Sequence, residues 1–117
     1  MQPEERDAAY LWDMLQAAKE VELMLENHDL PTFLNDRVLV RALERGIEII
    51  GEAARRVSTS FMDSHPEIPW RRIIGQRNIL AHEYGQVDHE LLYKTVIDDV
   101  PELIVMLENL LPPIEEG

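Results

Sequence analysis

Side chains suited to phosphate and proton chemistry gather in one short segment, Arg77-Asn78-Ile79-Leu80-Ala81-His82-Glu83-Tyr84. Histidine exchanges protons near neutral pH, and arginine presents a fixed, forked positive charge to a phosphate. Cleavage of RNA by its own 2′-hydroxyl needs both functions, because protons must move and the charge on the transition state must be stabilised. Arg77 and His82 are therefore candidate catalytic residues, with Asn78 and Tyr84 in supporting roles.

The spacing of these residues constrains how they cooperate. On an ideal helix Arg77 and Tyr84 share a face, and so do Asn78 and His82. Arg77 and His82, however, lie about 140° apart and about 7.5 Å apart along the axis. Either the helix is distorted near His82, or the two residues line a cleft whose far wall is a second copy of the helix. The second option predicts a two-fold homodimer with a composite site.

A structural role accounts for the same residues. Arg77 would then pair with a carboxylate such as Asp98 or Asp99, and His82 would be a buried histidine with its hydrogen bonds satisfied. On the residues alone, this is the simpler interpretation. The segment lacks the second histidine of an H-E-x-x-H zinc helix, and the chain has no cysteine. We therefore expect no metal and no cofactor.

The elements that must position this segment are helices. Apolar residues recur at steps of three and four, and nothing alternates with a period of two. The pattern predicts helices over 4–27, from a cap at Asn35 or Asp36 to about Val57, over 70–84, and from Asp88 to the prolines at 112 and 113. The segment 61–68 is predicted to be irregular, and Pro101 to kink the last helix. The expected fold is all-α, an antiparallel bundle of four to five helices in a single domain over residues 1–117.

The charge of the chain is uneven. The net charge is −12, but residues 37–77 contain eight arginines and five acidic residues, a local excess of +3. An ordinary solvated helix surface with pairs between neighbouring turns explains this pattern, and charge alone favours it. The alternative is contact with RNA, for which the candidate residues are Arg41, Arg45, Arg71 and Arg72. We find no secretion signal and no apolar run that could span a membrane, and therefore expect a cytoplasmic protein.

The arrangement Arg77, four residues, His82, one residue, Tyr84 resembles the R-x4-H-x-Y motif of the HepT-type toxins in the HEPN family. Further matches surround it, and together they span nearly the whole chain. They are Ile49-Ile50-Gly51-Glu52-Ala53-Ala54, Pro66-Glu67-Ile68-Pro69-Trp70, Val87-Asp88 and the stretch from Asp98 to Pro101. A bare R-x4-H motif is weak, but this framed set is specific and reverses the preference for a structural role.

The resemblance implies a HEPN-like helical homodimer in which Arg77 and His82 line a cleft between protomers. It implies a metal-independent endoribonuclease that cleaves mRNA or tRNA, as the toxin of a type II or type VII toxin–antitoxin system. The implied antitoxin is a minimal nucleotidyltransferase of the MntA type, which neutralises the toxin by transferring AMP to Tyr84. Asn78 would be the polar residue that usually follows the arginine.

Two other functions stay open. The chain could be a non-catalytic subunit that binds substrate for, or serves as adaptor of, a nucleotidyltransferase. It could also be a purely structural bundle, in which substitutions of His82 and Tyr84 change stability alone.

Overall fold

The regular structure of the chain is entirely helical in the computed structural model, which describes residues 5–75 and 88–111. A further helical segment covers residues 70–75. The all-α prediction is confirmed. The other elements, in chain order, are α1 (Glu5–Leu25), α2 (Leu30–Leu34), α3 (Arg37–Arg56), α4 (Thr59–Ser64), α6 (His89–Asp98) and α7 (Val100–Leu110).

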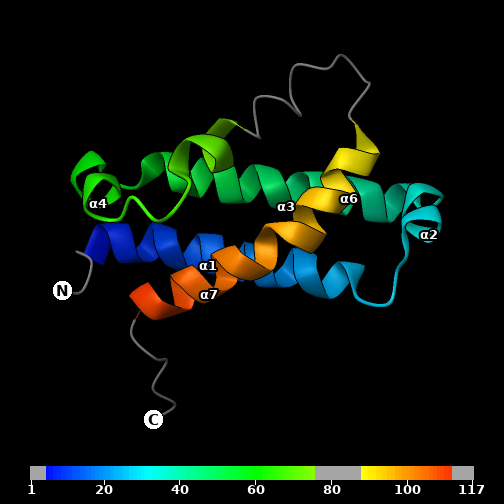
Figure 1. Cartoon of the computed structure of the whole chain (residues 1–117), viewed down its shortest axis with the longest axis horizontal. Coiled ribbons are helices and arrows are strands. Elements are labelled where there is room, and N and C mark those ends of the chain that lie inside the picture. The colour runs from blue at the N-terminus through cyan, green and yellow to red at the C-terminus, as the bar shows by residue number, and fades with distance from the viewer. Residues whose placement is uncertain (1–4, 76–87, 112–117) are drawn as a thin grey trace, which may run out of the picture.

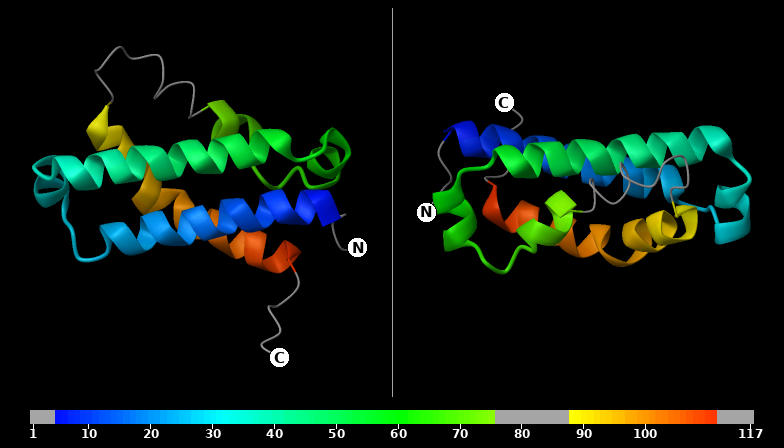
Figure 2. Two further views of the ribbon diagram at one scale, coloured as in Figure 1. Left: turned by 180° about the vertical axis from the view of Figure 1, so that it is seen from behind. Right: turned by 90° about the horizontal axis from the view of Figure 1, so that it is seen from above.

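Two long helices form the base of the fold. α1 and α3 run antiparallel and side by side, and the α6 and α7 ribbons cross one face of this pair obliquely (Figures 1 and 2). The apolar stripes of α1 and α3 face this shared interior, where Leu11, Met14, Val21 and Leu43 are fully buried. α6 and α7 add Leu92, Val96 and Leu107 to the same core.

The helices α1 and α3 approach closely at Gly46. A Cβ atom added to Gly46 would overlap Cγ1 of Val21, and Val21 is itself fully buried. The contact needs a residue without a side chain, because a β-branched valine in a helix has little rotamer freedom with which to move away. Gly46 therefore sets the distance between the two long helices.

A buried carboxylate joins the start of α1 to the end of α3. Asp7 is 4% exposed and accepts two hydrogen bonds from Ser58, one from the backbone N–H at 2.9 Å and one from Oγ at 2.6 Å. Ser58 is also the N-cap of α4, where its Oγ accepts a hydrogen bond from the N–H of Phe61. One serine thus connects three helices.

The last helical run breaks at Asp99, two residues before Pro101. α6 ends at Asp98, α7 begins at Val100, and Asp99 lies between them. Pro101 has no N–H and cannot donate to the carbonyl of Ile97, so the change of direction falls where the sequence predicted it. After the break, α7 packs mainly on α1, whereas α6 contacts α2, α1 and α3.

The predicted ends of the long helices are nearly correct. Asp36 caps α3 by accepting from the N–H of Leu39, and Asp88 caps α6 by accepting from the N–H of Leu91. α1 ends at Leu25, two residues before the predicted end. Asn27 follows with a positive φ of 66°, a conformation that asparagine tolerates better than most residues and that cannot continue a right-handed helix.

Two short helices were not predicted. α2 is capped by Asp29, whose pKa is lowered by its hydrogen bonds to Thr32. α4 occupies part of 61–68, so the prediction of an irregular segment is wrong for its first half. Helices of five and six residues are too short to show a repeating apolar stripe, and in both the signal is the capping residue.

Replacing Gly46 with alanine should destabilise the protein by about 1–3 kcal/mol, although alanine has the higher helix propensity, because the new methyl group overpacks the core. Urea unfolding of Gly46→Ala, Val21→Ala and the double variant measures the effect. We expect the double variant to be more stable than the sum of the single changes predicts. Additive changes would show that Gly46 and Val21 do not limit the helix spacing.

Removing the carboxylate of Asp7 should cost about 2–3 kcal/mol, because two hydrogen bonds to a charged group are lost and Ser58 keeps unsatisfied donors. The measurement is the free energy of unfolding of Asp7→Ala. Asp13→Ala is the matched control, since Asp13 is exposed on the same helix and should change stability by less than about 0.5 kcal/mol. Equal effects of the two substitutions would contradict the role of the Asp7–Ser58 contact.

Candidate functional site

The motif residues Arg77, Asn78, His82 and Tyr84 lie outside the described residues. The structure does describe the chain on both sides of them, up to Gly75 and again from Asp88. The helical segment 70–75 leads into the motif, and α6 follows it. These flanking elements show how the fold holds the two ends of the motif segment.

The start of the helical segment 70–75 is held by an aromatic cluster. Trp70 is 8% exposed, and its indole N–H donates to the backbone carbonyl of His65 at 3.0 Å. The ring of Phe61 meets Trp70 edge to face and stacks on His65 at a centroid distance of 4.1 Å. Because a buried tryptophan with a satisfied N–H has few alternative positions, the segment starts from a fixed point.

A second contact attaches this segment to the C-terminal part of the bundle. The guanidinium of Arg72 donates from an NH group to Oδ2 of Asp99 at 2.8 Å, and the two residues are 27 positions apart in the chain. Asp99 lies at the break between α6 and α7. The structural interpretation of the motif predicts that Arg77 pairs with Asp98 or Asp99. In the structure, Asp99 forms an ion pair with Arg72.

The other end of the motif segment is also attached to the bundle. Nε2 of His89, in the first turn of α6, lies 3.4 Å from a carboxylate oxygen of Glu44 on α3. Further along α6, the Tyr93 hydroxyl donates to the backbone carbonyl of His28. The described residues on both sides of the motif are therefore attached to the bundle, through Asp99 on one side and through Glu44 on the other.

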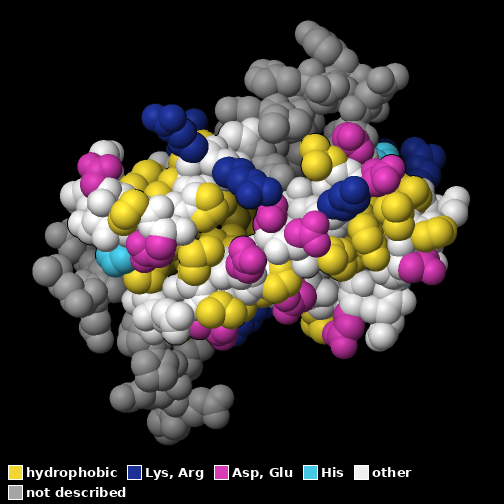
Figure 3. Space-filling view, viewed as in Figure 1, with side chains coloured by type: hydrophobic (Ala, Val, Ile, Leu, Met, Phe, Trp, Pro, Cys, Tyr) yellow, Lys and Arg dark blue, Asp and Glu magenta, His cyan; other side chains and the backbone are white. Residues whose placement is uncertain are grey.

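The four arginines proposed to contact RNA differ in their surroundings. Arg45 lies 3.1 Å from Glu48, and Arg72 is paired with Asp99. Arg41 and Arg71 are exposed and form no ion pair with residues in the described ranges. On the face seen in Figure 3, Lys and Arg side chains are interspersed with Asp, Glu and apolar side chains over the described residues. Two of the four candidates, Arg45 and Arg72, are therefore paired with carboxylates.

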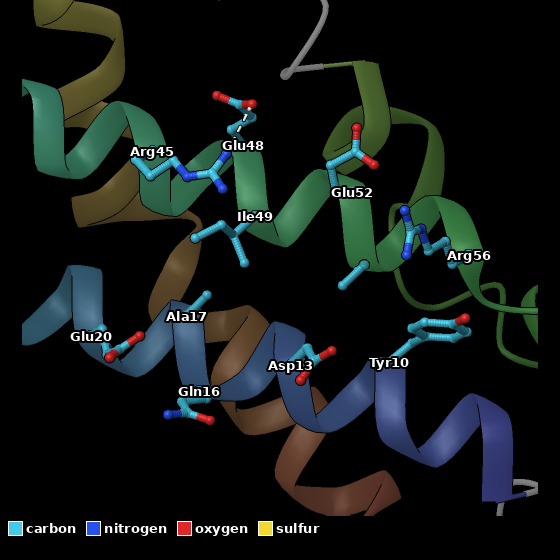
Figure 4. A pocket seen from close by; sticks show the side chains of 11 residues that line it. Tyr10, Asp13, Gln16, Ala17, Glu20, Arg45, Glu48, Ile49, Glu52 and Arg56 are labelled. Carbon is cyan, nitrogen blue, oxygen red and sulfur yellow. Dashed lines mark hydrogen bonds and ion pairs between the residues drawn. The ribbon is translucent and has the colours of Figure 1, made fainter.

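Arg45 belongs to a groove on the outer side of the α1 and α3 pair, facing away from α6 and α7 (Figure 4). The groove holds about 470 Å³. Carboxylates line both walls, and Arg45 and Arg56 lie toward its two ends. The acidic lining residues are Asp13, Glu20, Glu48 and Glu52. Because carboxylates outnumber arginines, this groove is poorly suited to an RNA backbone.

Two further properties concern the residues in the ranges 5–75 and 88–111. No three His, Asp or Glu side chains there are grouped so as to hold a metal ion. Within the same ranges, no helix combines the length and apolar character that crossing a membrane requires.

Comparison with known proteins identifies the family. Residues 14–110 match the family model described as ribonuclease HepT-like. The chain belongs to this family, and the matched region includes the segment Arg77 to Tyr84. The resemblance inferred from the motif is confirmed.

The alignments with several relatives cover most of this chain and most of the relative. The probable ribonuclease HepT of Thermococcus cleftensis is 39% identical over 101 residues, which is 86% of this chain and 92% of the relative. "Putative RNase MJ1380" of Methanocaldococcus jannaschii is 39% identical over 81% of this chain and 87% of its own length. "Putative RNase TTE0752" of Caldanaerobacter subterraneus subsp. tengcongensis is 33% identical, over 87% and 91%. No solved structure gives a significant match.

Sequence reasoning missed the contact between Arg72 and Asp99. It named Asp99 as a partner for Arg77 and Arg72 as a contact for RNA. No local pattern links two residues so far apart, so nothing in the sequence could have identified this pair.

Proposed function

We propose that this protein is a ribonuclease in which Arg77 and His82 carry out the cleavage of RNA. The observation that carries the proposal is the family match over residues 14–110, because it includes the complete R-x4-H-x-Y motif. The relatives named as ribonucleases support it. The described fold adds that both flanks of the motif are attached to the helical bundle.

The proposed reaction uses the RNA's own nucleophile. The 2′-hydroxyl oxygen attacks the adjacent phosphorus, the bond from phosphorus to the 5′-oxygen breaks, and the products are a 2′,3′-cyclic phosphate and a 5′-hydroxyl. One group must take the proton of the 2′-hydroxyl and another must protonate the leaving oxygen. His82 exchanges these protons, and Arg77 stabilises the negative charge on the pentacoordinate phosphorus. Protein groups alone supply this chemistry, in keeping with the proposed metal independence.

The active unit in this proposal is a homodimer. Arg77 and His82 diverge on an ideal helix, and a two-fold axis brings the motifs of two protomers to one cleft. Two copies of His82 would then provide the base and the acid. Of the four arginines proposed to contact RNA, we assign this role to Arg41 and Arg71, since Arg45 and Arg72 are paired with carboxylates.

Replacing His82 with alanine should reduce the rate of RNA cleavage by at least about a hundred-fold, because proton transfer is lost. The measurement is cleavage of total RNA by purified protein in the presence of EDTA, with mapping of the new ends. His28→Gln is the matched control, since His28 lies in the connection between α1 and α2 and its ring bonds the carbonyl of Glu26. Equal cleavage by wild type and His82→Ala would refute the assignment.

The proposal extends to regulation by a partner. The protein would be the toxin of a toxin–antitoxin pair, and a minimal nucleotidyltransferase would be the antitoxin. This enzyme would join the phenolic oxygen of Tyr84 to the α-phosphorus of ATP and release pyrophosphate. The added AMP would place bulk and negative charge beside Arg77 and His82, where a phosphate group repels RNA.

Co-expression with a minimal nucleotidyltransferase of the MntA type should add the mass of one or more AMP groups to this protein. Peptide mass spectrometry should locate the adduct on Tyr84 and find none in Tyr84→Phe. Tyr10→Phe serves as the control, because Tyr10 lies in the outer groove between α1 and α3 (Figure 4) and should leave the adduct unchanged. An adduct that persists in Tyr84→Phe would show that another residue is modified.

A further inference from the structure

Asp99 occupies an unusual position for a carboxylate at a helix start. It is the N-cap of α7, where an aspartate ordinarily accepts a hydrogen bond from a backbone N–H in the first turn. Here it makes no such bond and has helical dihedral angles, φ −98° and ψ −35°. Its carboxylate instead accepts from Arg72 at 2.8 Å.

Asp99 lies between two helix ends, because it is the C-cap of α6 and the N-cap of α7. The dipoles of the two helices oppose each other there, and the guanidinium of Arg72 is the cation that contacts its carboxylate. The Asp99 side chain is 34% exposed and that of Arg72 is 65% exposed, so the pair is partly open to solvent. Exposed ion pairs contribute little to overall stability. The value of this contact therefore lies in geometry, because it fixes where one helix lies against another.

Arg72 is five residues before Arg77 in the sequence. The helical segment 70–75 is attached at two residues. Its first residue, Trp70, donates its indole N–H to the carbonyl of His65, and about half a turn later Arg72 pairs with Asp99. Two attachment points on one short helix define its position and its direction. The described chain before the motif therefore ends, at Gly75, in a helical segment that is attached at two residues.

We propose that Asp99 and Arg72 are positioning residues of the ribonuclease reaction, which set the orientation of the chain entering the motif at Arg77. The inference rests on the proposed ribonuclease function. It assigns Arg72 a role within the fold, in place of the direct contact with RNA that the sequence suggested. Neither residue touches the reacting phosphate in this account.

The test compares two substitutions that distinguish positioning from RNA contact. Asp99→Asn and Arg72→Gln should each lower kcat about ten-fold and leave KM within about two-fold, since misplacing catalytic groups slows the chemical step. Arg72→Lys, which keeps the charge, should restore part of the lost kcat. If Arg72 contacts RNA instead, Arg72→Gln raises KM, and Asp99→Asn frees the guanidinium and lowers KM. That result would overturn the proposal.

Glu108→Gln and Lys19→Gln are the matched controls. These residues form another ion pair between helices, at 3.2 Å, with side chains 53% and 50% exposed, and it joins α1 to α7. Their loss should leave kcat and KM unchanged. Equal losses of kcat in the control variants and in Asp99→Asn would show that any surface pair of the bundle has this effect, and would also overturn the proposal.

A second readout is independent of catalysis. In Asp99→Asn, amide hydrogen exchange of a peptide covering residues 68–75 should become several-fold faster, because one attachment of this segment is lost. Unchanged exchange would show that the pair does not hold the segment. A wild-type protein that fails to cleave RNA would refute the proposed ribonuclease function and, with it, the positioning role. Active wild type with unchanged Asp99→Asn kinetics would refute the positioning role alone.

Discussion

The close approach of α1 and α3 at Gly46 is the constraint on which the other packing depends. These two helices form the surface on which α6, α7 and the segment around Trp70 rest (Figure 2). A wider spacing between them would separate the Val21 and Leu43 side chains and displace the helices that cross above. The residues that flank the motif depend on this geometry, since they are attached to elements that pack on α1 and α3. One missing side chain therefore influences residues that are distant from it in the sequence.

Three contacts that hold the bundle and the helical segment 70–75 together are of different kinds. A buried aspartate bonds Ser58 where α3 ends, an indole N–H holds Trp70 to the carbonyl of His65, and an exposed ion pair joins Arg72 to Asp99. The first two are buried or nearly buried and contribute to stability. The third is open to solvent and contributes mainly direction. Stability and orientation thus depend on separate contacts, which allows one to be changed without losing the other.

The sequence predicted the long elements well because their apolar stripes extend over several turns. α1, α3, the start of the helix at Trp70 and the break near Pro101 all follow from periodicity, capping residues and proline chemistry. The short helices α2 and α4 were not predicted, because they complete too few turns to show an apolar stripe, although Asp29 and Ser58 cap their starts. The pairing of Arg72 with Asp99 depends on how distant helices pack, which no local pattern encodes. The motif itself was found from residue types and spacing, and the family match confirms the resemblance it carries.

The outer groove between α1 and α3 has a consequence for how the charge of this chain is distributed. Its charged residues face solvent on the side away from the core, and Arg45 is already neutralised by a neighbour on its own helix. Only the floor of this groove belongs to the core, at the buried residues Ala17 and Ala53. The charged side chains on its walls take no part in the apolar packing of the bundle. Part of the negative net charge of this chain is therefore carried by a surface of α1 and α3 that faces away from α6 and α7.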